Sequence, residues 1–321
     1  MFEFSSLGPT MAMISTGIKT ASELAEKYQT QLSTNQQEME YSGLGDKASL
    51  YSTLESFLKV KEAEIDNALF IGPDFLVAQN SIESIRHYAE EFSTLVNQAS
   101  QNELPGYDYQ KSAKTTLNLV RDILNARASE RYVCGGSVIN ELPVDLTLLP
   151  DPATYNLNDT DDVPIDPNNP QSKPTYYKGD NNIQKLQIDN QSLSIAYTAN
   201  ELGPQRLIRA LHILSSADPN ALDYKQKVKE VARVASLAVT DLRNMEARLG
   251  SVGNSIKEAK THITSQNLGF SIQMEDVNGI NKNESAIKAM SAINLVNVNN
   301  QIATQIMRSS ERACDMFLGV R

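Results

Sequence analysis

The chain has 321 residues, enough for two domains of ordinary size with real hydrophobic cores. Its 29 Lys and Arg against 39 Asp and Glu give a net charge of −10, which argues against nucleic acid binding and against a polybasic membrane contact. Trp is absent and aromatic residues make up 6% of the chain, so a large aromatic-lined ligand cavity is not expected.

The N-terminal residues do not have the pattern of a signal peptide. Glu3 is acidic, the first basic residue is Lys19, and the apolar stretch 11–14 is interrupted by Ser, Thr and Gly. The uncharged run 289–307 contains six Asn and Gln side chains, which are too costly to bury in lipid for a membrane span. We therefore expect a cytoplasmic protein, or one exported without a cleaved signal.

Heptad spacing of apolar residues predicts a first helix near the start of the chain. Apolar positions recur at alternating intervals of three and four, which is the narrow seam of a coiled coil. These residues are Met11, Ile14, Ile18, Ala21, Ala25, Tyr28 and Leu32.

The same spacing recurs in three later segments. A second run covers 71–99, and the longest continues without a break over 228–263. The last run has nearly the same period and consists of Leu295, Val298, Ile302, Ile306, Ser309, Ala313 and Met316. At the start of the second run, Gly72-Pro73 is expected to kink or break the helix, because proline lacks a backbone donor.

The length of the 228–263 helix determines the expected architecture. At ~1.5 Å per residue it would be roughly 54 Å long, and so narrow a seam is not stable alone. Its available partners are the helices of the first half of the chain. The N- and C-terminal segments should therefore form an elongated, coiled-coil-like helical bundle.

The middle of the chain differs from both ends. Asn, Asp and Pro in 156–170 indicate a loop, and the alternation in 185–197 predicts two strands joined by a turn at 189–191. A short helix follows Gly203-Pro204, and Asp218-Pro219 has the pattern of a helix start. The expected fold class is mainly α with a small β-rich insertion.

We expect three domains. The ranges 1–40 and 284–321 would form a terminal helical assembly domain. The ranges 41–130 and 222–283 would form a long-helix bundle, and 131–221 a central β-rich domain.

Few residues in the sequence indicate a catalytic or metal-binding site. His87 and Glu91 share a helix face but lack a third metal ligand. Asp159, Asp161 and Asp162 lie in a stretch that lacks the central Gly and the final Glu of a calcium loop. Cys134 and Cys314 are expected to be free thiols, with no metal or redox spacing around them. We therefore expect no enzyme activity, no cofactor and no metal.

Several stretches along the chain carry a family likeness. The most extensive starts at 122–137, where a long helix gives way to the β region. The positions concerned are Leu124, Asn125, Arg131, Tyr132, Gly136, Ser137, Pro143 and Val144, followed by 176–180, 197–200, 207–211 and 247–251. In this order they resemble the flagellin superfamily, and within it the branch of hook-filament junction proteins. Glu130 and Cys134 depart from the family pattern, which usually has Gly and an aromatic residue there.

The resemblance implies a structural component of the bacterial flagellum. Flagellins usually carry particular Asn-rich patterns in and after the first helix that are missing here, and 41–46 is closer to the junction branch, which makes flagellin itself the alternative. A phage neck or tail coiled-coil protein is a more distant one. Implied partners are other copies of the chain in a ring or layer, flagellin, another hook-associated protein and a flagellar export chaperone.

The resemblance also implies a location and an interface. Such proteins reach the outside of the cell through the flagellar secretion channel without a cleaved signal. Their terminal helices order when they meet neighbouring subunits. The apolar residues of the two terminal seams, 11–32 and 295–316, are therefore the expected subunit-interface residues.

Overall fold

A computed structural model describes residues 7–101, 108–152, 155 and 174–318. The chain divides into two compact units, Met1–Val60 with Gln266–Arg321 (unit 1) and Lys61–Ser265 (unit 2). The three-domain division expected from the sequence stays a prediction. The loop expected over 156–170 and the acidic residues 159–162 lie outside the described residues.

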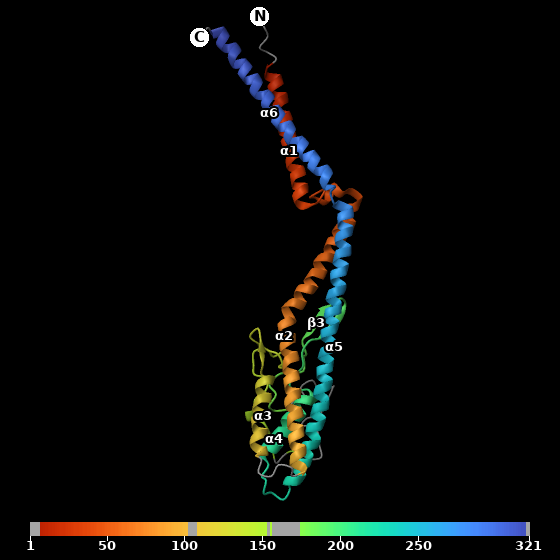
Figure 1. The fold of residues 1–321 in the computed structure, drawn as a ribbon, viewed down its shortest axis with the longest axis vertical. Helices are drawn as coiled ribbons and strands as arrows, with labels where there is room; N and C mark the ends of the chain where they lie inside the picture. The colour runs from red at the N-terminus through yellow and green to blue at the C-terminus, as the bar shows by residue number, and fades with distance from the viewer. Residues whose placement is uncertain (1–6, 102–107, 153–154, 156–173, 319–321) are drawn as a thin grey trace. The chain divides into compact units, whose positions relative to one another are not determined.

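Unit 1 is built on a pair of helices from the two ends of the chain. Helix α1 spans Leu7–Thr34 and helix α6 spans Lys282–Leu318, and they lie side by side (Figure 1). Asn299 approaches Gly17 near the chain ends, and the Lys288 ammonium lies 5.9 Å from the Tyr28 ring centroid further in. The pair is therefore antiparallel.

The remainder of unit 1 comes from two long helices that continue into unit 2. Helix α2 spans Ala48–Gln101 and follows a short 3-10 helix, Tyr41–Lys47. Helix α5 spans Tyr224–Asn278. In unit 1 the rings of Phe57 and Phe270 stack with centroids 5.8 Å apart.

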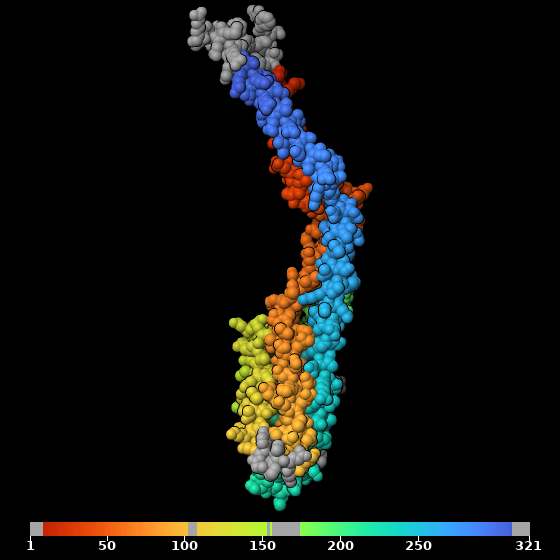
Figure 2. All heavy atoms as spheres, in the orientation of Figure 1, coloured from red at the N-terminus to blue at the C-terminus, as the bar shows by residue number. Residues whose placement is uncertain are grey.

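In unit 2, α2 and α5 share one hydrophobic core with α3 (Tyr109–Leu124) and α4 (Leu202–Ser216). Ion pairs join Arg86 to Glu246 at 2.6 Å and Glu90 to Arg243 at 2.8 Å, so α2 and α5 run antiparallel. Figure 2 shows α2 and α5 in contact along this unit. The core includes Ala78, Ile82, Ile85, Ala89, Phe92 and Val96 of α2, and Val228, Val231, Ala235, Ala238, Leu242, Met245 and Leu249 of α5. These are positions of the two seams expected from the heptads.

The strands are short and form two antiparallel hairpins. β1 (Arg127–Ala128) pairs with β2 (Arg131–Tyr132), and β3 (Lys185–Ile188) pairs with β4 (Gln191–Ser194). The turn between β3 and β4 places Asp189 and Asn190 at φ 47° and 61°, a conformation that Asn and Asp tolerate better than most residues. A short 3-10 helix spans Leu146–Leu148. The expected fold class, mainly α with a small β-rich insertion, is confirmed.

Two local expectations were wrong or only partly met. Of the kink or break expected at Gly72-Pro73, the break is not present, because helix α2 continues through the exposed Pro73. Asp218 caps a turn, accepting from the amide of Asn220 at 2.9 Å, and α5 begins only at Tyr224. No described helix is both long and apolar enough to cross a membrane.

Candidate functional site

The apolar seam of α1 faces α6 of the same chain. Ala21 is 1% exposed and Ala25 is 9% exposed, which makes them the centre of the contact. The other seam residues are half-buried, namely Met11, Ile14, Ile18, Tyr28 and Leu32. The side of α1 that was expected to face other subunits is thus already covered in the monomer to a large extent.

The side of α6 that contacts α1 is made mostly of small residues. Its positions also recur at intervals of three and four, which fits the antiparallel pair. They are the buried Ser285, Ala289 and Ala292 and the half-buried Val296, Asn299, Ala303 and Ile306. This face was missed in the sequence because its Ser, Asn and Ala side chains give almost no hydrophobic signal, although their spacing was readable.

Of the four expected interface residues of α6 whose side chains the structure describes, three lie away from α1. Leu295, Val298 and Ile302 are 50%, 49% and 40% exposed, whereas Ile306 is half-buried at the edge of the contact. The side chains of Ala313 and Met316 lie outside the described residues.

Leu295, Val298 and Ile302 lie on successive turns of α6 and form one apolar surface. Ile287, which is 65% exposed, lies on the same side of the helix about two turns earlier, with the exposed Ser291 between. We call these four residues the α6 stripe. Contiguous exposed apolar surface on a soluble protein commonly marks an interaction site.

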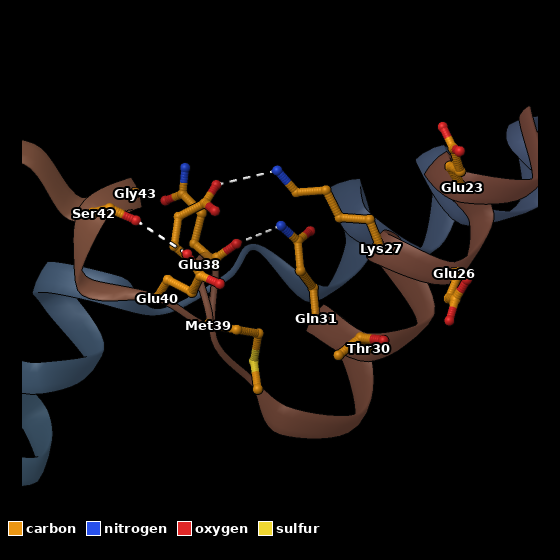
Figure 3. A pocket seen from close by; sticks show the side chains of 11 residues that line it. Glu23, Glu26, Lys27, Thr30, Gln31, Glu38, Met39, Glu40, Ser42 and Gly43 are labelled. Atoms are coloured by element: carbon orange, nitrogen blue, oxygen red, sulfur yellow. Dashed lines mark hydrogen bonds and ion pairs between the residues drawn. The ribbon is translucent and has the colours of Figure 1, made fainter. Parts of the chain in front are cut away.

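Unit 1 also contains a pocket where α1 meets the segment that follows it (Figure 3). Glu23, Glu26, Glu38 and Glu40 line it, and Lys27 Nζ lies 3.2 Å from Glu38 Oε1. Glu23, Glu26 and Glu40 are exposed, whereas Glu38 is half-buried and paired with Lys27. Among the described residues, no three His, Cys, Asp or Glu side chains gather as metal ligands would.

The segment beside this pocket is fastened by a buried asparagine. Asn278 is 2% exposed, its Oδ1 accepts from the Glu38 amide and its Nδ2 donates to the Glu38 carbonyl, both at 2.8 Å. The amide of Gln37 donates to the Asn278 carbonyl at 2.7 Å. Asn278 thus links the chain after α1 to the end of α5 within unit 1.

The three histidines are not brought together. His87 lies 3.2 Å from Glu91, His212 Nδ1 lies 3.1 Å from the Tyr155 hydroxyl, and His262 Nδ1 lies 2.6 Å from Asp189 Oδ2. Cys134 is fully buried, and burial raises the pKa of its thiol to about 12. A thiol in that state is a poor nucleophile, because the thiolate is the reactive form.

No protein family model and no curated protein matches this chain. Among solved structures it is similar to the crystal structure of FlgL from Bacillus cereus, with a TM-score of 0.52 and 18% identity over 70% of this chain and 99% of the other. A second similar structure, from Vibrio parahaemolyticus, is described as a flagellar hook-associated protein; its TM-score is 0.39 and its identity 12%, over 77% of this chain and 96% of the other. The first match shows a shared fold, as the sequence resemblance predicted. The second score is too low to do so.

Proposed function

We propose that this protein is a structural, non-enzymatic component of the bacterial flagellum, situated where the hook joins the filament. The observation that carries this proposal is the α6 stripe, an uncovered apolar surface on a terminal helix of a chain with the fold of the Bacillus cereus protein. A subunit that works alone would gain nothing from exposing Leu295, Val298 and Ile302.

The stripe suits a contact with another subunit better than a contact with lipid. Asn294 and Gln301 are exposed beside it, and amide groups need hydrogen-bond partners that hydrocarbon does not supply. In a protein layer, such amides can bond to neighbouring chains or to water. The proposed partners are therefore other copies of this chain in a ring or layer.

Further partners follow from a position between two different assemblies. A junction layer has to bind flagellin on one side and another hook-associated protein on the other. Before assembly, the stripe needs protection from aggregation, which supports binding to a flagellar export chaperone. The proposed location is extracellular, after export through the flagellar channel without a cleaved signal. We include no nucleic acid and no membrane among the partners.

Deleting the gene tests this function. The deletion strain should make hooks without filaments and should lose flagellin to the medium, because flagellin has no layer on which to begin assembly. Excess flagellin should not restore motility, whereas the wild-type gene on a plasmid should. Normal filaments in the deletion strain would show that the proposal is wrong.

The same strain separates the junction role from the alternative role of flagellin. A junction layer needs few copies, so this chain should be a minor component of sheared filaments, measured by quantitative mass spectrometry. If it is instead the most abundant protein of those filaments, it is a flagellin. In that case the resemblance at 41–46 and 131–137 to junction proteins is misleading.

A further inference from the structure

Unit 2 has an open apolar groove between α2, α5 and the β3–β4 hairpin. Ile71 and Phe75 of α2, Leu186 and Ile195 of the hairpin segment, and Ile256 of α5 line it. Its volume is about 430 Å³. Lys257 and Lys260 also line the groove, and no ion pair joins either of them to another described residue. The groove thus combines an apolar surface with unpaired positive charge.

The same helix α2 exposes a second apolar surface that no described residue of unit 2 covers. Leu69, Phe70 and Leu76 are 60%, 69% and 56% exposed, and Pro73 between them is exposed as well. We call these four residues the α2 patch. The Arg131 guanidinium lies 5.7 Å from the Phe70 ring centroid at one edge and leaves most of the ring accessible. Four neighbouring apolar side chains of this size indicate a contact surface.

The patch and the groove lie on different sides of α2. On a helix with 3.6 residues per turn, the mean direction of Leu69, Pro73 and Leu76 is roughly 130° from that of the groove residues Ala68, Ile71 and Phe75. A copy of the chain therefore cannot place its own patch in its own groove. A patch and a complementary cavity on different sides of one molecule produce head-to-tail contacts, which extend into rings or helical arrays.

The charges beside the two surfaces are complementary. Glu62 and Asp66 are exposed and precede Leu69 on the same side of α2, at helical spacing. Neither makes an ion pair with another residue that the structure describes. If the apolar residues of the patch enter the groove, these carboxylates can meet Lys257 and Lys260 of the other copy. Such a pairing would determine which chain binds and in which orientation.

We propose that the α2 patch of one copy occupies the groove of the next copy, in a repeating head-to-tail contact of unit 2 that rests on the assembly role proposed above. A small apolar anion is the other occupant that the groove chemistry allows. The second copy is favoured because the chain itself carries a surface with the matching apolar residues and the opposite charge.

Crosslinking of the purified full-length chain tests the contact directly. Leu69→Cys and Thr261→Cys place one thiol in the patch and one at the groove, in a Cys314→Ser background. With a short bis-maleimide, the double variant should give dimers, trimers and longer multimers, because each copy offers one of each surface. Either cysteine alone should not give multimers longer than dimers. Absence of multimers from the double variant overturns the proposal.

Filling the groove gives a variant that should stay folded. A Cβ at Gly72 would meet no atom within 4 Å, so Gly72→Leu can extend into the groove without a clash, and replacing a helical glycine favours the helix. Gly72→Leu should abolish the multimers. Gly250→Leu is the matched control, because Gly250 is also helical and open but does not line the groove. Multimers that survive Gly72→Leu, or that Gly250→Leu removes equally, contradict the proposal.

Charge reversal tests the orientation. Lys257→Glu with Lys260→Glu should abolish the multimers, and adding Glu62→Lys with Asp66→Lys to the same chain should restore them. Lys225→Glu with Lys229→Glu makes the same charge change elsewhere on α5 and should have no effect. Multimers unaffected by the first reversal overturn the contact. They leave the flagellar role untouched, because the deletion strain tests that role separately. If a small apolar anion is the true occupant, adding it should suppress crosslinking in the double-cysteine chain. That result also counts against the proposal.

Discussion

Because Cys134 is buried, the protein should lose stability as the pH rises into the alkaline range. Burial raises the pKa of this thiol to about 12, whereas its ordinary value is 9.0. Between these two values the unfolded chain releases the proton and the folded chain keeps it. Stability from this group is therefore complete below pH 9.0 and falls as the pH rises toward about 12.

Cys134→Ala should remove this dependence. A single fully shifted group contributes at most ~1.4 kcal/mol per pH unit, so the variant should lose roughly 1 kcal/mol less than the wild type between about pH 8 and about pH 10. Urea unfolding at the two pH values measures the difference. Cys134→Ser, which cannot ionise in this range, should behave like the alanine variant. Equal losses in all three chains would mean that the thiol is not held protonated.

Asn278 offers a second test at the scale of one side chain. Asn278→Ala removes both side-chain hydrogen bonds to Glu38 and leaves the backbone amide and carbonyl of Glu38 without these partners. The change should lower the free energy of unfolding of unit 1 by about 1–3 kcal/mol. Hydrogen exchange of the Glu38 amide should accelerate accordingly. Asn254→Ala, an exposed position on the same helix, should leave this exchange rate unchanged. Unchanged exchange in Asn278→Ala would show that the link is not stabilising.

At the scale of whole helices, the long heptad runs predicted both the helices and their buried sides. Ile82, Ile85 and Leu242 are fully buried, as their seam positions required. This worked because large aliphatic side chains at a strict period have few alternative arrangements in a helix. The β3–β4 hairpin was equally readable from its alternation and its Asp-Asn turn.

Helix α6 was harder to predict because it has two sides with heptad spacing. The more apolar one, with Leu295 and Ile302, dominates any reading of the sequence, while the contact with α1 uses Ala289, Ala292 and Asn299. Small residues allow two helices to approach closely but give little hydrophobic signal. Hydrophobicity alone therefore could not identify which side contacts the helix of the same chain.

Substitutions on the α6 surface proposed to contact other subunits should have different effects from substitutions in the core of unit 2. Ile302→Asp should stop assembly while unit 2 stays folded, because a carboxylate in a packed contact between subunits costs several kcal/mol without a partner. Ile306→Asp should also leave unit 2 folded, but it should loosen the α1–α6 pair as well, because Ile306 lies at the edge of that contact. Leu242→Asp should unfold the monomer, since Leu242 is fully buried in the core of unit 2. Circular dichroism with complementation of the deletion strain measures both properties.

The control for these substitutions is an exposed leucine outside the proposed contacts. Leu222→Asp should affect neither folding nor assembly, because Leu222 is fully accessible in the turn before α5. If Ile302→Asp and Leu242→Asp destabilise the monomer to the same extent, the division between intrachain and intersubunit surfaces is wrong.

At the scale of the whole molecule, the two units have very different cores. Among the described residues of unit 1, the buried apolar ones are few and mostly small, with Ala21, Ala25, Ala289 and Ala292 alongside Tyr51 and Leu54. Unit 2 buries a large cluster of Ile, Leu, Val, Phe and Tyr side chains. Because stabilisation scales with the apolar area removed from water, unit 1 should be much the less stable of the two.

Unfolding in urea should therefore proceed in two steps, with unit 1 opening first. At a urea concentration between the two midpoints, a protease of broad specificity should digest 7–60 and 266–318 and leave a fragment close to 61–265, identified by mass spectrometry. Ala292→Gly lies in the α1–α6 contact and should lower only the first midpoint, by the ~0.5–1 kcal/mol that glycine costs in a helix. A single cooperative transition, or an Ala292→Gly variant that shifts both midpoints equally, would show that the units do not unfold independently. Two steps would mean that the surface proposed for assembly belongs to the part of the chain that opens most easily, where contacts with neighbouring subunits have the most stability to add.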